Sequence, residues 1–326
     1  MTTSSRAAWF RDAFTLLADN VETVIQGKRP AIELALVCLC AEGHLLLEDV
    51  PGVGKTQMAR AIAGSISGTW KRIQFTPDLL PSDVTGVSIF NQKSLEFEFK
   101  PGPVFANVVI GDEINRASPK TQSALLEVME EQRVTVDAVA HPVPRPFVVI
   151  ATQNPIDLDG TYKLPEAQLD RFLLRTRIGY PDHGAEVGIL QSRKLGTPID
   201  ALEPVMGLND MQTMVDVASE VHVDPSIQGY IVSLAEATRG DADTRLGASP
   251  RASLGLMRAS SAWAASQGRD FVTPEDIKVL AEPVFAHRLV LTPEAELHGR
   301  TAEQVVGRAL AAVPVAASTA GRLVRS

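Results

Sequence analysis

The feature that most constrains the fold is a short glycine-rich segment between an apolar run and a helical pattern. Residues 51–56 (PGVGKT) follow residues 44–48 (HLLLE), which have the length of a strand, and precede a helical pattern over 55–65. Glycine permits the positive φ and the close backbone approach that such a turn requires. A strand, a glycine turn and a helix in this order point backbone N–H groups at one spot, which binds anions. The context therefore predicts a phosphate-binding loop.

The loop offers three kinds of group to a nucleoside triphosphate. Its amides would surround the phosphates, Lys55 would place a positive charge at the β- and γ-phosphates, and the Thr56 hydroxyl would bind Mg²⁺, which takes few protein ligands. The usual pattern G-x-x-x-x-G-K-[ST] has glycine first, and here Asp49 takes that place for no reason the sequence shows. We predict that ATP contacts Pro51, Gly52, Val53, Gly54, Lys55, Thr56 and Gln57.

A second motif places two carboxylates at the end of a strand. Residues 107–111 (NVVIG) are largely apolar, as in a strand buried on both faces of a parallel sheet, and Asp112 and Glu113 follow. Beside a phosphate loop, Asp112 would hold Mg²⁺, mainly through water, and Glu113 would polarise the attacking water. A kinase need not activate water, so the pair favours hydrolysis. The alternative is two exposed acids at a strand end.

Further polar residues follow at the ends of later elements. Asn154 comes after the apolar run 147–152 (FVVIAT), where it could sense the γ-phosphate or cap a turn. An arginine offered to a neighbouring subunit's γ-phosphate would stabilise transition-state charge. Arg171 is our candidate, with Arg116 and Arg175 as rivals, and the alternative is a structural ion pair.

Two weaker candidates complete the predicted site. Arg251 lies in the first turn of a helix after Ser249-Pro250 and could reach the nucleotide from a lid, although an ion pair is the alternative. The segment 24–27 (VIQG) precedes the phosphate loop, and its residues Ile25 and Gly27 could form an apolar bed for adenine. A simple helix end is an equal alternative for this segment.

The chain alternates strands and helices first and shows only helical patterns later. Its N-terminal part includes helical patterns over 7–26, 29–41 and 118–132, a strand over 72–75 and a hairpin over 87–99. Beyond Pro181-Asp182 the helical patterns are 186–194, 210–219, 225–239, 252–266 and 274–280. We therefore predict an α/β domain over 1–182 and a helical lid domain over 183–326.

Composition excludes several classes of protein. The 326 residues carry a net charge of −8, with 39 acidic against 31 basic residues, which argues against a protein that mainly grips nucleic acid. The only cysteines, Cys38 and Cys40, rule out a disulfide framework and suit buried thiols of a core helix. We see neither a signal peptide nor an apolar run of about 20 residues that would span a bilayer, and we expect a cytoplasmic protein.

These motifs together resemble the MoxR-type AAA+ ATPases over nearly the whole chain. The resemblance is carried by residues 45–63, 72–86, 98–131, 147–174 and 247–264, and the runs 115–117 (NRA) and 164–168 (LPEAQ) are distinctive for that family. Asp49 lies within the family's normal range.

The resemblance implies more than the spacing does. The fold would be a three-layer α/β/α domain with a five-stranded parallel sheet, followed by an all-α lid. The segment 87–99 would be an inserted hairpin facing a central pore. The active form would be a ring, most often a homo-hexamer, with Arg171 acting in trans. Such rings act like chaperones on client proteins, often with a separate partner that contains a von Willebrand factor A domain.

Other functions stay open at this point. The magnesium chelatase ATPase subunit is a related alternative, ranked lower because the best-matching stretches are those of the MoxR group. A nucleotide-gated scaffold with incidental turnover is a second alternative. A DNA-directed motor is a third, although the acidic balance and the lack of an appended DNA-binding domain speak against it.

Overall fold

The structure is a computed structural model that describes residues 3–154, 162, 164–192 and 198–315. Contacts group the chain into one unit over 13–213 and another formed by 1–12 with 214–326. Residues near 205 belong to the first unit because the amides of Val205 and Met206 donate to the carbonyl of Ser65. The sequence instead suggests a boundary at 182/183, and that boundary stays a prediction. No helix among the described residues is long and apolar enough to cross a membrane.

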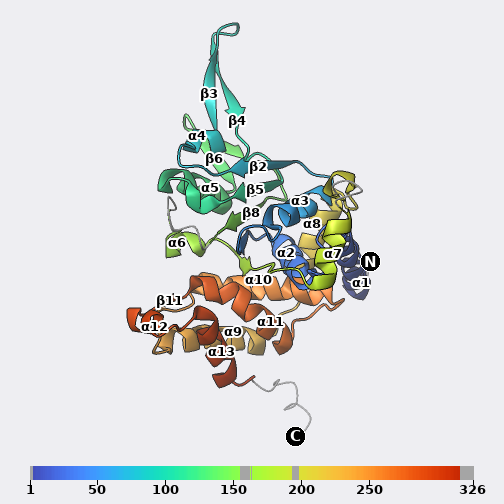
Figure 1. The fold of residues 1–326 in the computed structure, drawn as a ribbon, viewed down its shortest axis with the longest axis vertical. Coiled ribbons are helices and arrows are strands. Elements are labelled where there is room, and N and C mark those ends of the chain that lie inside the picture. The colour runs from blue at the N-terminus through green and yellow to red at the C-terminus, as the bar shows by residue number, and fades with distance from the viewer. Residues whose placement is uncertain (1–2, 155–161, 163, 193–197, 316–326) are drawn as a thin grey trace. The chain divides into compact units, whose positions relative to one another are not determined.

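The centre of the first unit is a five-stranded parallel sheet with helices around it (Figure 1). The strand order is β2-β5-β8-β1-β9, which confirms the expected parallel AAA+ sheet. The central strands β5 and β8 are almost fully buried, as their apolar runs predict. The strands are β1 (Leu45–Glu48), β2 (Trp70–Gln74), β5 (Val108–Asp112), β8 (Val148–Gln153) and β9 (Leu174–Thr176).

The helices of this unit begin where the sequence carries start signals. Pro30 lies in the first turn of α2, and the Ser118 hydroxyl accepts a hydrogen bond from the Thr121 amide at the start of α5. Helix α1 ends four residues before the predicted end at 26, and Gly27 follows at φ 69°. The helices are α2 (Arg29–Cys40), α3 (Lys55–Gly64), α4 (Pro81–Thr85), α5 (Pro119–Glu131), α6 (Glu166–Leu169) and α7 (His183–Ser192). Two more, α1 (Thr3–Glu22) and α8 (Leu208–Ser219), belong partly to each unit.

Two β-hairpins extend from the sheet domain. The predicted one is formed by β3 (Gly86–Asn91) and β4 (Glu96–Pro101), and it projects away from the sheet (Figure 1). The second, β6 (Arg133–Val136) with β7 (Val139–Pro142), has no clear signal in the sequence. Its two turn residues are Asp137 and Ala138 at φ 50° and 63°, so the turn lacks the glycine that usually marks such a hairpin.

A ring contact joins the two hairpins. Phe99 of β4 stacks on His141 of β7 with centroids 4.1 Å apart, and Phe99 also meets Phe105 edge to face at 5.4 Å. Aromatic pairs at these distances contribute about 0.5–1.5 kcal/mol beyond burial. The Phe99–His141 contact therefore holds strand β4 of one hairpin against strand β7 of the other.

The second unit is mainly helical, as expected. Helix α10 packs on α9 and α11, and α13 packs on α9. In addition, β10 (Thr244–Leu246) and β11 (Val290–Leu291) form a short antiparallel pair that a sequence pattern does not reveal at this length. The helices are α9 (Pro225–Gly240), α10 (Pro250–Ser266), α11 (Pro274–Phe285), α12 (Pro293–Leu297) and α13 (Ala302–Ala312).

The cysteines and helix α7 also agree with the predicted pattern. Cys38 and Cys40 are free, buried thiols of α2, as predicted. The predicted helix over 186–194 corresponds to α7, and its predicted last two residues lie outside the described residues.

Candidate functional site

The glycine-rich loop joins β1 to α3 in a conformation that needs two of its glycines. Gly52 has φ 85°, and Gly54, the residue before α3, has φ 96°. A Cβ added at either position would meet no atom within 4 Å. The positive φ, rather than crowding, is therefore what these positions require of glycine.

Lys55 is the first residue of α3, and its ammonium group faces the loop's own backbone. Its Nζ donates to the carbonyl of Asp49 and, at 3.1 Å, to the carbonyl of Val50. Both acceptors belong to the loop, so the positive charge lies within the turn that the sequence assigns to phosphates. The ammonium is partly buried, which strengthens its attraction for an anion.

The structure explains Asp49, the one departure from the usual loop pattern. Its Oδ1 accepts a hydrogen bond from the Val50 amide at 2.8 Å. Its Oδ2 accepts from the amides of Ile178 at 2.9 Å and Gly179 at 2.6 Å. Asp49 is nine-tenths buried, so its charge is compensated by backbone donors rather than by water. The carboxylate thus fixes the start of the loop to the segment after β9, which a glycine could not do.

The end of β5 meets the start of α3 through Asp112. The Thr56 hydroxyl donates to Asp112 Oδ1 at 3.0 Å, and the Thr152 hydroxyl donates to the same oxygen at 3.2 Å. Arg72 Nε donates to Oδ2 at 2.6 Å. Asp112 is 2% exposed, and each of these partners supplies a hydrogen-bond donor. The predicted metal pair, Thr56 and Asp112, is therefore brought together.

Glu113 follows in a conformation that non-glycine residues rarely adopt. Its backbone has φ 56° and ψ 50°, and its amide donates to the Thr152 hydroxyl at 3.0 Å. Its Oε2 accepts from Gln74 Nε2 at 3.2 Å and pairs with Arg116 Nη1 at 3.1 Å. A left-handed residue costs on the order of 1–3 kcal/mol and is most often retained at functional sites.

Asn154 lies at the end of β8, and the sheet order decides its neighbours. Strand β8 lies between β5 and β1, so Asn154 stands between the carboxylates after β5 and the phosphate loop after β1. It is 6% exposed, and its carbonyl accepts from Asn115 Nδ2 at 3.2 Å. Asn154 thus directly follows the buried strand β8, as the sequence predicts.

The three candidate arginines each form an ion pair within this chain. Arg171 Nη2 lies 3.0 Å from Glu130 Oε2, Arg175 Nη1 lies 2.8 Å from Glu48 Oε2, and Arg116 binds Glu113. The Arg175 side chain is 19% exposed and the Arg171 side chain 27% exposed. Since an ion pair within one chain does not decide which arginine meets a second chain, the choice among them stays a prediction.

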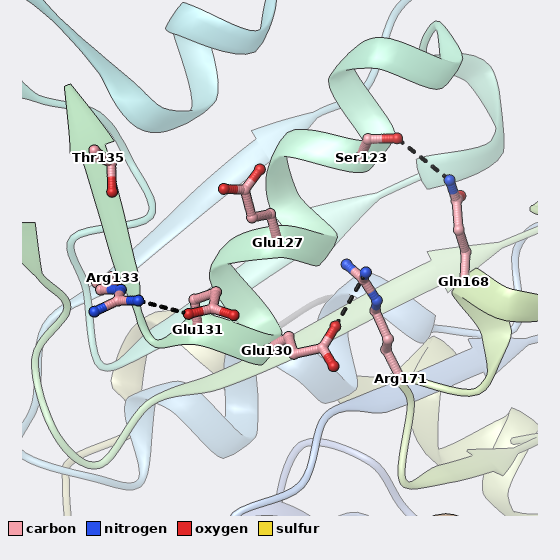
Figure 2. A pocket seen from close by; sticks show the side chains of 8 residues that line it. All are labelled: Ser123, Glu127, Glu130, Glu131, Arg133, Thr135, Gln168 and Arg171. Carbon is pink, nitrogen blue, oxygen red and sulfur yellow. Dashed lines mark hydrogen bonds and ion pairs between the residues drawn. The ribbon is translucent and has the colours of Figure 1, made fainter. Parts of the chain in front are cut away.

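Arg171 lines a pocket. The pocket has a volume of about 570 Å³ and lies along α5, with Arg171 and Gln168 on one side (Figure 2). Gln168 Nε2 donates to the Ser123 hydroxyl at 3.3 Å, beside the Arg171–Glu130 pair (Figure 2). The lining is polar, with three glutamates against two arginines, and consists of Ser123, Glu127, Glu130, Glu131, Arg133, Thr135, Gln168 and Arg171.

The remaining predicted residues are placed less closely. Ile25 is buried beyond the end of α1, and a Cβ on Gly27 would lie 3.5 Å from the Cβ of Ala185 in α7. Arg251 is an exposed residue in the first turn of α10, in the helical unit. These observations leave the adenine bed and the lid arginine as predictions.

Sequence reasoning missed Thr152, Arg72 and Gln74. Arg72 and Gln74 lie two residues apart on β2, which pairs with β5 so that Gln74 is opposite Asp112. Polar residues at i and i+2 share one face of a strand. On that face of β2, Arg72 and Gln74 bond to the carboxylates at the end of β5. The alternation is visible in the sequence, but the pairing of these two strands is not.

The oxygen donors suit a magnesium-bound triphosphate. A hydroxyl and a carboxylate 3.0 Å apart beside a lysine are the few hard ligands that Mg²⁺ takes from a protein. The described residues contain no group of three or more His, Cys, Asp or Glu side chains that could cage a metal. Thr56 and Asp112 are thus the residues that would hold Mg²⁺ bound to phosphates.

Comparisons with known proteins agree with this geometry. Residues 44–174 match the model of the ATPase family associated with various cellular activities (AAA), and residues 236–309 match that of the AAA lid domain. The YeaC protein of Bacillus subtilis is 51% identical, over 94% of this chain and 97% of its own length. Chaperone MoxR1 of Mycobacterium tuberculosis is 42% identical, over 90% of this chain and 80% of its own length.

A solved structure extends the match to three dimensions. The crystal structure of a proposed ATPase from Cytophaga hutchinsonii superposes with a TM-score of 0.89 and 37% identity, over 96% of this chain and 98% of that one. The sequence matches, the two matched domains and the sheet order lead to one assignment. The chain belongs to the MoxR family of AAA+ ATPases.

Proposed function

We propose that the protein hydrolyses Mg²⁺-bound ATP and uses the reaction to remodel or activate partner proteins. The observation that carries the proposal is the 3.0 Å hydrogen bond between Thr56 and Asp112, which places the loop hydroxyl and the strand carboxylate at one point. Glu113 follows Asp112 directly. Phosphoryl transfer needs mainly positioning and charge stabilisation, and these residues supply both.

Each residue has a role in this proposal. The loop 51–57 surrounds the phosphates, and Lys55 moves its ammonium from loop carbonyls to phosphate oxygens. Thr56 and Asp112 would hold Mg²⁺, which would neutralise charge on the phosphates. Glu113 accepts the proton of the attacking water, and Asn154 orients that water.

Assembly completes the site. Arg171 would act on the nucleotide of a neighbouring subunit, and a closed homo-hexamer is the expected ring. The choice is supported by the position of Arg171, which lines a pocket and is partly exposed, so that a group from outside can reach its guanidinium. Arg251 would approach the nucleotide from the lid of the same subunit.

The β3–β4 hairpin is the proposed contact with a client protein. Its side chains include apolar groups that a folded monomer usually buries, and Leu95 and Phe97 are each 73% exposed. Phe90 and Phe97 pack edge to face, with centroids 5.3 Å apart. One relative bears the name chaperone, which supports a remodelling role here. A separate von Willebrand factor A protein is the expected partner.

The test is the steady-state ATPase rate of the wild type and Glu113→Gln, with and without a candidate partner. Glu113→Gln should bind ATP and lose hydrolysis by about 10²-fold or more, because a general base contributes typically 10²–10⁴-fold. Asp137→Asn, in a hairpin turn, is the control for the loss of one charge. A cell in which Glu113→Gln replaces the wild type without loss of function would favour the nucleotide-gated scaffold instead.

Two other functions receive less support. A magnesium-chelatase-like subunit would require activity with the other chelatase subunits, which can be assayed directly. A DNA-directed motor would require salt-dependent DNA binding at physiological ionic strength, and the net charge of −8 disfavours it.

A further inference from the structure

The metal end of the site contains a cation of the protein itself. Arg72 Nε donates to Asp112 Oδ2 at 2.6 Å, while the two threonine hydroxyls occupy Oδ1. Asp112 is buried, whereas the Arg72 side chain is 49% exposed. The guanidinium therefore reaches the acid from the solvent side and can leave it without losing hydration.

A chain of hydrogen bonds continues from Arg72 to Glu113. Arg72 Nη2 donates to Gln74 Oε1 at 3.1 Å, and Gln74 Nε2 donates to Glu113 Oε2 at 3.2 Å. Arginine has only donors, so it selects the oxygen of the Gln74 amide and turns the nitrogen toward Glu113. The orientation of Gln74 thus depends on where Arg72 lies.

We propose that Arg72 is a positioning residue that couples the metal end of the site to Glu113. The inference rests on the proposed Mg²⁺-ATP site. With its guanidinium on Asp112, Arg72 keeps Gln74 bonded to Glu113. The guanidinium competes with a divalent cation for the same carboxylate and is repelled when that cation binds. Its departure frees the Gln74 amide to turn, and Glu113 then loses one of the two donors that fix its carboxylate, the other being Arg116.

Linkage makes the coupling measurable without hydrolysis. If the Arg72–Gln74–Glu113 chain stabilises the arrangement with the guanidinium on Asp112, it must weaken binding of the cation by the same free energy. Weakening any bond of the chain should therefore tighten Mg²⁺ binding. The Gln74 amide bonds to Arg72 and Glu113 and not to the proposed metal ligands. If Gln74 only supported the local structure, its replacement would therefore leave Mg²⁺ binding unchanged.

The experiment measures ADP binding to the full chain by calorimetry, in EDTA and in saturating Mg²⁺. The readout is the factor by which Mg²⁺ tightens binding. Removal of a like charge near the cation should raise that factor on the order of tenfold in Arg72→Met. Lys71→Met is the matched control, because Lys71 is exposed on the opposite face of the same strand. Arg72→Lys keeps the charge but loses the planar fork that also reaches Gln74, so it should resemble Gln74→Leu rather than Arg72→Met.

Gln74→Leu tests the second link. Gln74→Leu should raise the factor by which Mg²⁺ tightens ADP binding by about threefold. In the double variant with Arg72→Met, Gln74→Leu should add less than this, because the two residues form one network. Equal factors in Arg72→Met and Lys71→Met would overturn the proposal, as would additive effects. Binding of ADP that Lys55→Ala leaves unchanged would instead refute the nucleotide site, so the two failures are distinguishable.

Discussion

Arg171 and Glu130 form an ion pair of 3.0 Å at the edge of the pocket along α5 (Figure 2). Arg171 is the arginine that we expect to act on the nucleotide of a neighbouring subunit, and here it is paired within its own chain. Both side chains are partly exposed, so the pair contributes little stability, about 0–1 kcal/mol. The γ-phosphate of a nucleotide bound to a second subunit could therefore replace Glu130 at a small cost in free energy.

Removal of Arg171 should impair hydrolysis without impairing binding. We expect Arg171→Ala to bind ATP as the wild type does and to hydrolyse it on the order of 10³-fold more slowly, because its charge acts in the transition state. Mixing Arg171→Ala with Glu113→Gln should restore part of the activity through composite sites. Arg133→Ala, another arginine of the same pocket, is the control. Absence of rescue would assign the role to Arg116 or Arg175, or indicate a monomeric enzyme.

We expect the Asp49 carboxylate to position the phosphate loop. Comparing Asp49→Ala with Asp49→Asn distinguishes the loss of its hydrogen bonds from the loss of its charge. Asp49→Ala leaves the amides of Ile178 and Gly179 without acceptors, at a cost of about 1–3 kcal/mol for each buried donor. We expect ADP binding by calorimetry to weaken by about tenfold or more. Asp49→Asn keeps one acceptor oxygen and should lie between. Asp49→Gly, which restores the usual pattern, should behave like alanine, and wild-type affinity there would contradict this assignment.

The helical unit should lose stability in acid through Asp241. Its hydrogen bonds with Arg308 at 2.8 and 2.7 Å lower the pKa of Asp241 below its usual value. A carboxylate with a lowered folded pKa stabilises the fold above the unfolded pKa of about 3.9 and loses that contribution as the pH decreases through the folded pKa. Urea unfolding at pH 7 and pH 3 should therefore differ less in Asp241→Asn than in the wild type.

The control for that experiment is Asp270→Asn, an exposed aspartate of the same unit. Asp270→Asn should keep the wild-type difference between the two pH values. The same difference in all three proteins would show that the Asp241–Arg308 pair does not contribute.

Local chemistry in the sequence predicts much of this fold. The glycine positions of the loop, the Ser118-Pro119 start of α5 and the buried runs of β5 and β8 are set by propensities and periodicity within a few residues. The same reasoning finds the strand-end residues Asp112 and Asn154 and the loop residue Thr56, because parallel strands end at one edge of a sheet.

The missed features depend on pairing between distant segments. Asp49 meets Ile178 across 129 residues, and Arg72 meets Asp112 across 40. Neither contact has a periodic signal. The β6–β7 hairpin escapes prediction because Ala138 takes the positive φ at which such a turn usually has glycine.

The most direct test of the account is nucleotide binding by Lys55→Ala, measured by calorimetry with ATP and Mg²⁺. Lys55 belongs to the loop that we assign to the phosphates, and its ammonium lies on loop carbonyls that phosphate oxygens can replace. Lys93→Ala, in the turn of the β3–β4 hairpin, serves as the control. We predict that Lys55→Ala abolishes tight ATP binding while the control keeps it. An affinity of Lys55→Ala within a few-fold of the wild type would contradict the assignment of the site.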